Sequence, residues 1–291
     1  MFGLNEIVGK SFFKDAKSQE LLVTSRFFTL QGEGPFRGQP AYFIRLAKCN
    51  LACSFCDTYF DTGEWRSFEL LLVEMSQVIE DFFKQRNLSV PAWAKDSPRK
   101  MILVITGGEP SLQANLSAFL QMTQPYFSHT QIESNGVSVL SDLPEKTVLV
   151  VSPKCLEKAG QAVKYLEPNS KMLARADCLK FVMSAPEDAQ FSAYSEVPAW
   201  AHEWATQTGK PVFISPMNIY KREPRRAKFM RDQGQELSMA QRSEINEVVS
   251  FWEPDLLNLQ KNQRNHEYAA EYCMKYGFTL NLQIHLFASL P

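Results

Sequence analysis

The stretch MILVITGGEPSLQANLSAFLQM, residues 101–122, contains the unit that decides the fold. Its first five residues are apolar and rich in β-branched side chains, which is typical of a buried strand. SLQANLSAFLQM, which follows the glycine-containing turn, fits a helix. This order of strand and helix returns along the chain, and such alternation predicts a parallel sheet with helices outside it.

Other segments extend the pattern on both sides. Strands are expected at 41–47, 130–132, 147–151, 178–183 and 211–214, and helices at 67–85, 196–208, 239–251 and 265–276. About six strand–helix units predict an α/β fold, namely a full or partial (β/α) barrel. Long connections are expected at 86–99, 155–177 and 221–235.

Composition excludes several classes of protein. The chain has 291 residues, is 45% hydrophobic and carries a formal net charge of -1. These values exclude a disordered chain and a collagen-like repeat, and the small charge argues against general binding to nucleic acid or acidic membranes. We expect neither a secretory signal nor a membrane span. Three of the six cysteines lie within eight residues, which does not resemble a disulfide framework and suggests a reducing, cytoplasmic location.

The cysteine cluster lies in KCNLACSFCDTYFD, residues 48–61. Cys49, Cys53 and Cys56 have the spacing C-x3-C-x2-C, so three thiolates on one loop can hold three corners of a [4Fe–4S] cluster and leave one iron open. A structural zinc site is an alternative, but it usually has four protein ligands. A redox CxxC motif is another, but it leaves Cys49 unexplained.

Polar motifs follow several predicted strands. TGGEP, residues 106–110, contains two glycines that let the backbone approach a ligand closely. ESNG, SPK and SPMN begin at Glu133, Ser152 and Ser215. Each motif alone also fits an ordinary turn or helix cap. Because the carboxyl ends of parallel strands form the active site of a barrel, their shared placement predicts a single site.

Two sets of residues resemble a known family. The cysteine spacing with Phe55 before the last cysteine, together with GGEP, resembles the radical S-adenosylmethionine (SAM) enzymes. LQGEG at 30–34, Gly38-x-Pro40, FIRL at 43–46 and CDT at 56–58 resemble the 7-carboxy-7-deazaguanine synthase (QueE) family. The resemblance implies a modified, partial (β/α) barrel with insertions, in a single radical SAM domain over residues 1–291 whose cluster loop covers 49–58.

The same resemblance implies an activity and partners. Members of the family are carbon–nitrogen lyases of queuosine-type 7-deazapurine biosynthesis. They convert 6-carboxy-5,6,7,8-tetrahydropterin to 7-carboxy-7-deazaguanine with loss of ammonia, using a [4Fe–4S] cluster, SAM and Mg²⁺. A homodimer and a flavodoxin-type or other electron donor are implied as well, whereas direct contact with nucleic acid or membrane is not expected.

Residue by residue, the resemblance assigns four groups. Cys49, Cys53 and Cys56 bind the cluster, and Thr58 binds Mg²⁺. The SAM site comprises Phe55, Cys56, Asp57, Gly107, Gly108, Glu109, Ser134, Ser152, Pro153, Lys154, Ser215, Pro216, Met217 and Asn218. The substrate site comprises Leu30, Gln31, Gly32, Glu33, Arg45, Thr106, His285 and Pro291. Lys154 and His285 are also candidates for proton transfer.

Three positions depart from the family pattern. Lys48 stands where glycine is usual, Ser215 replaces the glutamine of a QPM motif, and Phe55 is often tryptophan in relatives. Near the end of the chain, the family pattern predicts LNLQI as a strand before His285. Two alternatives stay open: another radical SAM enzyme, such as a glycyl-radical activase, and a non-catalytic cluster-binding regulator.

Overall fold

A curved, mostly parallel sheet organises the computed structural model, which describes residues 6–223, 228, 249–252 and 255–290. Within these residues the sheet has the strand order β11-β10-β9-β6-β5-β4-β2-β1-β3. In this order, each pair of neighbouring strands between β11 and β2 is parallel, whereas β1 pairs antiparallel with both β2 and β3. The end strands β3 and β11 do not pair with each other within the described residues, so the barrel is partial, as predicted.

The elements have the following bounds. The strands of the sheet are β1 (Glu20–Leu30), β2 (Pro40–Leu46), β3 (Glu64–Ser67), β4 (Arg99–Gly107), β5 (Phe127–Ser134), β6 (Thr147–Val151), β9 (Cys178–Met183), β10 (Val212–Pro216) and β11 (Thr279–Leu280). β7 (Cys155–Lys158) and β8 (Gln161–Tyr165) form a separate hairpin. The helices are α1 (Phe68–Lys84), α2 (Ala92–Lys95), α3 (Leu116–Thr123), α4 (Ser170–Arg175), α5 (Ala199–Thr208), α8 (Leu259–Tyr276) and α9 (Ile284–Ala288). Short 3-10 helices are η1 (Lys10–Phe13), η2 (Pro110–Leu112), η3 (Gln124–Tyr126) and η4 (Ser192–Tyr194).

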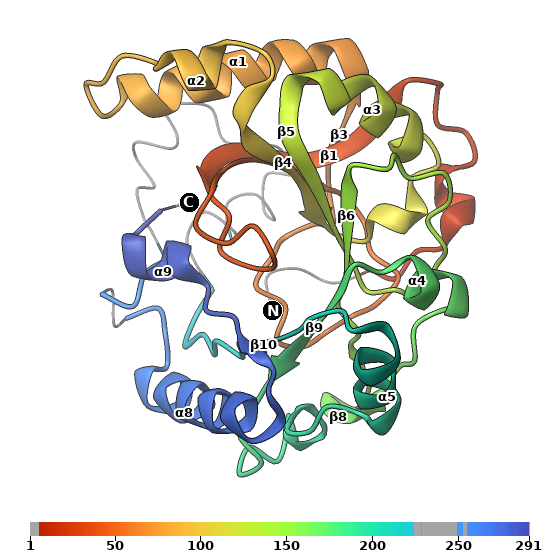
Figure 1. Cartoon of the computed structure of the whole chain (residues 1–291), viewed down its shortest axis with the longest axis vertical. Coiled ribbons are helices and arrows are strands. Elements are labelled where there is room, and N and C mark those ends of the chain that lie inside the picture. Colours follow the sequence, from red (N-terminus) through yellow and green to blue (C-terminus); the bar gives the residue numbers. More distant parts are fainter. Residues whose placement is uncertain (1–5, 224–227, 229–248, 253–254, 291) are drawn as a thin grey trace.

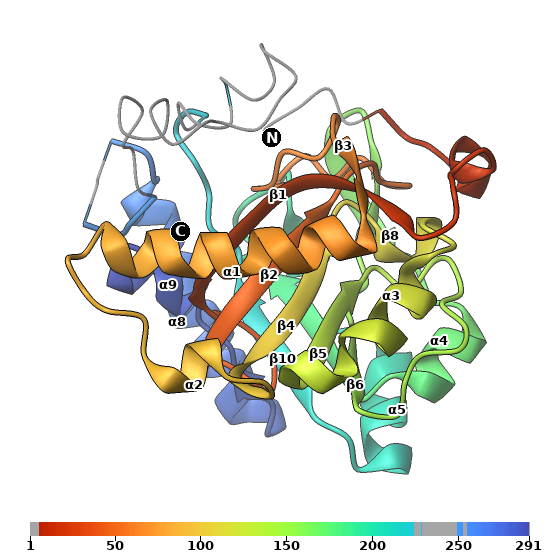
Figure 2. The same ribbon diagram turned by 90° about the horizontal axis from the view of Figure 1, so that it is seen from above.

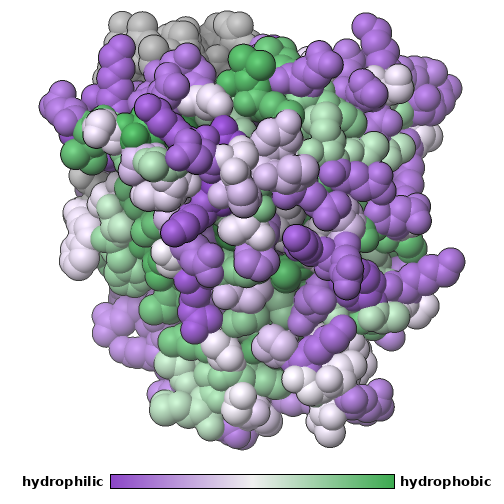
Figure 3. Space-filling model, turned by 45° about the horizontal axis from the view of Figure 1, so that its top comes forward, coloured by the Kyte–Doolittle hydropathy of each residue, from purple (hydrophilic) through white to green (hydrophobic). Residues whose placement is uncertain are grey.

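Helices surround the sheet, as Figures 1 and 2 show. Helix α1 buries Phe68, Leu71, Met75 and Ile79 on one stripe and lies across the first strands. Its start is fixed by Ser67, whose hydroxyl accepts a hydrogen bond from the Leu70 N–H. Hydrophilic side chains cover much of the face in Figure 3. Of the helices in the described residues, none has both the length and the apolar character needed to span a bilayer.

The strands predicted at 41–47, 101–105, 130–132, 147–151, 178–183 and 211–214 are confirmed, and β6 and β9 have the predicted bounds. The predicted helices at 67–85, 196–208 and 265–276 correspond to α1, α5 and α8. The helix predicted directly after TGGEP is partly wrong, because a 3-10 turn comes first and α3 begins at Leu116. The helix predicted at 239–251 lies mostly outside the described residues.

Other segments differ from the prediction. β1 was not expected, although its interior is continuously buried. The connection 155–177 contains the β7–β8 hairpin and α4, and 86–99 contains α2. The connection 221–235 lies mostly outside the described residues. LNLQI is not a strand: β11 ends at Leu280, and α9 begins at Ile284.

Candidate active site

One cavity lies on the inner side of the sheet, at the carboxyl ends of the parallel strands. It is lined by nearly all of the predicted cluster, SAM, metal and substrate residues. The lining comes from β1, β2, β4, β5, β6, β9 and β10, from the loops after them and from the segment after β11. Pro153 is buried beside the cavity and does not line it. Pro291 lies outside the described residues. The sheet therefore brings together motifs that are spread over more than two hundred positions.

The three cysteines of the cluster loop line this cavity as free thiols. Burial raises the pKa of Cys49 to about 12 and that of Cys53 to about 11, and it raises the pKa of Cys56 further. Thiolates are therefore unfavourable here unless a positive centre offsets their charge. Bound iron is such a centre, so the donor set fits an iron–sulfur cluster.

The GGEP loop packs directly on the backbone of the cysteine loop. Gly107 has φ +111°, and a Cβ on Gly108 would lie 1.7 Å from the carbonyl oxygen of Lys48. That carbonyl accepts a hydrogen bond of 2.8 Å from the Glu109 N–H. Both glycines are thus required by conformation and by space. The contact holds the cluster loop against the end of β4.

The carboxylate of Glu109 is buried and fixed from the next strand. It accepts hydrogen bonds from the Ser134 hydroxyl at 2.7 Å and from the Asn135 N–H at 2.8 Å. The Asn135 side chain then donates to Asn50 in the cluster loop at 2.7 Å. GGEP, ESNG and the cysteine loop are therefore one connected unit.

Lys48, at a position where the family pattern has glycine, makes contacts that glycine could not make. Its backbone is left-handed, with φ +71°. Its ammonium lies 2.9 Å from Glu6 and 5.3 Å from the ring centroid of Phe12. The side chain therefore ties the segment before β1 to the cluster loop, at the cost of a strained backbone.

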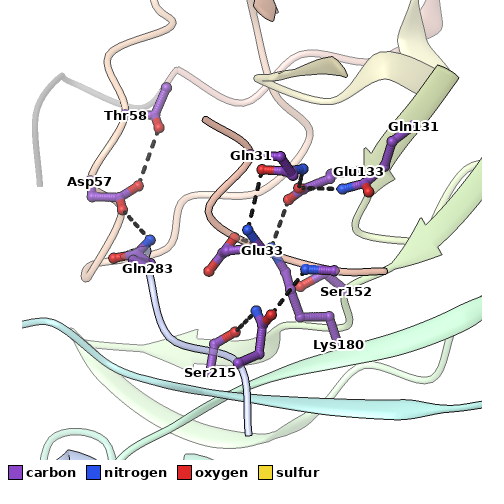
Figure 4. A network of polar contacts seen from close by, with 12 residues as sticks. Gln31, Glu33, Asp57, Thr58, Gln131, Glu133, Ser152, Lys180, Ser215 and Gln283 are labelled. Carbon is purple, nitrogen blue, oxygen red and sulfur yellow. Dashed lines mark hydrogen bonds and ion pairs between the residues drawn. The ribbon is translucent and has the colours of Figure 1, made fainter. Parts of the chain in front are cut away.

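A buried ion-pair network lies at the base of the cavity, as Figure 4 shows. The ammonium of Lys180 lies 2.5 Å from a carboxylate oxygen of Glu33 and 2.6 Å from one of Glu133. Gln31 and Gln131 each donate a side-chain hydrogen bond to Glu133, at 3.3 and 3.0 Å. The Glu33 N–H also donates to Gln31 at 3.2 Å.

Charge balance in this network is set by the lysine. Burial alone would lower the pKa of Lys180, but the carboxylates of Glu133 and Glu33 raise it well above its usual value. Burial opposes ionisation of Glu133 too, but Lys180 outweighs it and lowers the pKa of Glu133. Burial raises the pKa of Glu33 despite its contact with Lys180. Lys180 is therefore charged and holds the two carboxyl groups together.

Arg45 lines the cavity beside the cluster loop. Its Nη1 donates to the Thr58 hydroxyl at 2.8 Å, and its guanidinium lies 5.1 Å from the ring centroid of Phe27. Thr58 donates to the Asp57 carboxylate at 3.2 Å. The Nε of Arg45 is buried and has no hydrogen-bond partner among the described residues. Among the described residues one buried donor of the guanidinium is thus left unpaired, which is costly unless a ligand or water pairs with it.

The segment after β11 closes the cavity. The Asn281 side chain accepts from the Gly34 N–H at 3.0 Å and donates to Ser215 at 2.8 Å. Gln283 accepts from Asn218 at 2.7 Å and donates to Asp57 at 3.3 Å. The segment therefore connects the loop after β1 with the loop after β10.

His285 lies against Gly32 in this closure. A Cβ on Gly32 would lie 2.5 Å from Nδ1 of His285, so glycine is required by space. Burial lowers the pKa of His285 to about 4, which keeps the imidazole neutral at pH 7.

Oxygens suited to a hard cation are present at Thr58 and Asp57. Within the described residues, however, no three His, Cys, Asp or Glu side chains are grouped closely enough to hold a single metal ion.

Glu133, Lys180, Asn281 and Gln283 are among the polar residues that form or support the site and that had no role assigned from the sequence. Glu133, Lys180 and Gln283 line the cavity, and Asn281 supports it. Lys180 carried a detectable signal, since a charged residue in the centre of the apolar strand CLKFVM is unusual. Asn281 and Gln283 carry no such signal, because the pattern of LNLQI predicts a strand.

The chain is similar in sequence to several known proteins. No family model matches the chain. The 7-carboxy-7-deazaguanine synthase of Rickettsia prowazekii is 34% identical over 218 residues, covering 75% of this chain and 81% of the relative. The chain belongs to the 7-carboxy-7-deazaguanine synthase family. The protein of that name from Rhodospirillum rubrum is 32% identical over 226 residues, covering 74% of this chain and 82% of the relative.

A solved structure agrees with this family in its fold. The crystal structure of QueE from Escherichia coli matches with a TM-score of 0.52 at 20% identity, and the match covers 95% of this chain and 99% of that one. Membership of the 7-carboxy-7-deazaguanine synthase family makes this chain a radical SAM enzyme, with an iron–sulfur cluster and SAM as its cofactors.

Proposed function

We propose that this chain is a 7-carboxy-7-deazaguanine synthase, which contracts the ring of 6-carboxy-5,6,7,8-tetrahydropterin to 7-carboxy-7-deazaguanine with loss of ammonia. The observation that carries the proposal is that the three cysteines, the first three residues of GGEP and the charged groups Arg45, Glu33 and Lys180 line a single cavity. A cofactor that initiates the reaction and a polar, anionic substrate would therefore meet in one site.

The cofactor end of the cavity is formed by Cys49, Cys53 and Cys56. When bound, the cluster and SAM supply a one-electron reductive cleavage that starts radical chemistry on the substrate. The buried carboxylate of Glu109 is the group that would accept a hydrogen bond from the amino group of SAM. Its hydrogen bonds to Ser134 and Asn135 fix its orientation before the ligand arrives.

The substrate end is formed by Arg45 and the Lys180 network. A guanidinium grips a carboxylate through charge-assisted hydrogen bonds, which suits the substrate carboxyl group. The amino and ring N–H groups of the pterin are donors, so they suit the carboxylates of Glu33 and Glu133. Lys180 holds these two acceptors in place, and neutral His285, which lies against Gly32, can donate one hydrogen bond and accept another.

Mg²⁺ would bind at Thr58. The Thr58 hydroxyl accepts from Arg45 and donates to Asp57, so one oxygen lone pair is left for a cation. Two neighbouring oxygens, the substrate carboxylate and waters form a ligand set that Mg²⁺ accepts. We expect product formation to depend on Mg²⁺, and to depend on it far less steeply in Thr58→Val.

Other properties are part of the same proposal. The chain would act as one radical SAM domain in a cytoplasmic homodimer, and it would receive its electron from a flavodoxin-type or other donor protein. Lys154 is a candidate for proton transfer. Its ammonium donates to the carbonyl and hydroxyl of Ser152, both at 2.7 Å, and burial lowers its pKa.

The test is anaerobic reconstitution of the full chain with iron and sulfide, followed by incubation with SAM, dithionite, Mg²⁺ and the carboxypterin. Formation of 7-carboxy-7-deazaguanine supports the proposal, and Cys53→Ala should abolish both product and SAM cleavage. Cleavage of SAM without pterin product would favour another radical SAM enzyme. No cleavage by a fully loaded protein would favour a cluster-binding regulator.

A further inference from the structure

A carboxylate from the β7–β8 hairpin lies on the cluster loop. Ser54, which directly follows Cys53, donates its backbone N–H to both oxygens of Glu157, at 3.1 and 3.0 Å. Glu157 lies on β7, in a segment that the sequence indicated only as a long connection. The hairpin therefore reaches the backbone between two cluster cysteines.

Aromatic packing holds the hairpin in this position. The ring of Phe55 lies 5.1 Å from that of Tyr194, and the Tyr194 hydroxyl accepts a hydrogen bond of 2.9 Å from the Cys155 N–H. On β8, the Ala162 N–H donates to the Gln190 carbonyl at 2.9 Å. The contact between Glu157 and Ser54 is thus supported by several independent contacts between the hairpin, the cluster loop and η4.

Two charged groups lie within electrostatic reach of Cys53. The Glu157 carboxylate accepts from the backbone N–H of the residue after Cys53, and the Lys154 ammonium lines the same cavity as the Cys53 thiol. Any negative charge that the cluster acquires at this corner will therefore be opposed by Glu157 and favoured by Lys154.

We infer that Glu157 is a residue that tunes the reduction potential of the cluster, and that it keeps this potential low. The inference rests on the proposed function, because it assumes a cluster on these cysteines. The potential of such a cluster depends on nearby charge and on hydrogen bonds to its sulfurs. Reduction adds one electron from an external one-electron donor, so the Glu157 charge disfavours it. Glu157 also occupies the Ser54 N–H, which is then not free to donate to a sulfur.

The two effects have the same sign and can be separated by substitution. Glu157→Gln removes the charge and keeps an oxygen that can accept from Ser54. Glu157→Ala removes both the charge and the acceptor. Glu167→Gln is the matched control, because it makes the same charge change at an exposed position beyond the hairpin.

The experiment measures the midpoint potential of the reconstituted full chain without SAM, by EPR during an anaerobic redox titration. We expect Glu157→Gln to shift the potential to more positive values, Glu157→Ala to shift it further, and Glu167→Gln to leave it unchanged. Incomplete loading of a variant does not affect the comparison, since the potential is a property of the loaded fraction. Equal potentials in Glu157→Gln and the unmodified chain would overturn the inference.

Failure of this inference is distinguishable from failure of the proposed function. A chain that binds a cluster, cleaves SAM and forms product, but whose potential does not respond to Glu157→Gln, contradicts only the role of Glu157. A chain that binds no cluster on these cysteines contradicts both. Thermal unfolding of the cluster-free chains compares the melting temperatures of the Glu157 variants with that of the unmodified chain, and so shows whether a variant has lost its fold.

Discussion

Lys180 on β9 and Glu33 in the loop after β1 are 147 positions apart in the sequence, and their side chains meet at 2.5 Å. The same ammonium reaches Glu133 at the end of β5 at 2.6 Å. One buried cation therefore joins three strands of the sheet at the base of the cavity. Its removal would leave two buried carboxyl groups without their partner.

Lys180→Met should destabilise the fold and weaken substrate binding. Breaking a buried ion pair typically costs about 3–5 kcal/mol, so we expect the free energy of unfolding of the cluster-free chain to fall by about 3 kcal/mol. Chemical denaturation measures this change. In the loaded enzyme, KM for the pterin should rise. The rate of SAM cleavage measured without pterin should fall by a smaller factor.

Lys180→Arg is the matched control, because it keeps the charge. It should recover most of the lost stability and only part of the substrate affinity, since a guanidinium does not fit the position of an ammonium. A Lys180→Met chain as stable as the unmodified one would contradict the ion-pair assignment.

Arg45→Met should separate substrate binding from SAM cleavage. A hydrogen bond to a charged group contributes about 1.5–3 kcal/mol, which corresponds to roughly a tenfold to hundredfold increase in KM for the carboxypterin. SAM cleavage in the absence of pterin should stay close to normal. A pterin analogue that lacks the carboxyl group should bind Arg45→Met and the unmodified chain equally. If the two chains differ greatly in their affinity for this analogue, Arg45 does not act by binding the substrate carboxyl group.

Lys48→Gly and Lys48→Ala test the strained backbone at φ +71°. Both variants lose the contacts with Glu6 and Phe12, but only alanine keeps a Cβ in the left-handed region. Lys48→Gly should therefore be more stable than Lys48→Ala by about 1 kcal/mol. Thermal unfolding of the cluster-free chains measures the difference, and equal melting temperatures would refute the strain.

His285 should make stability depend on pH. Its pKa is lowered from 6.5 to about 4 in the folded chain, so between these values the unfolded chain binds a proton that the folded chain does not. Stability should therefore fall as the pH falls from about 6.5 towards 4, and this contribution should be constant above pH 7. Denaturation of the cluster-free chain across this range should show a steeper loss than in His285→Asn. Parallel curves would show that His285 does not titrate as the structure implies.

Much of the site is predictable because parallel strands end at one edge of the sheet. GGEP, ESNG and SPK lie at the carboxyl ends of β4, β5 and β6, and these strands are neighbours in the sheet. Lys180 was missed because the residue type alone suggests an exposed side chain. Leu179 and Phe181 pack in the main core, and the alternation of side chains along β9 then turns Lys180 to the other face, towards the cavity.

The remaining features depend on contacts that no local pattern records. β1 pairs antiparallel with β2, so it falls outside the strand–helix alternation used for prediction. The β7–β8 hairpin is polar on one side and is held by Phe55 and Tyr194 rather than by its own pattern. Asn281 and Gln283 acquire their roles only because β11 ends after two residues.

The central claim is that SAM and the pterin occupy one cavity, and isotope transfer tests it most directly. With substrate that carries deuterium at C6, we predict that the reconstituted enzyme transfers deuterium to 5′-deoxyadenosine while it forms 7-carboxy-7-deazaguanine. Deoxyadenosine that contains no deuterium, formed in the presence of the labelled pterin, would contradict the account.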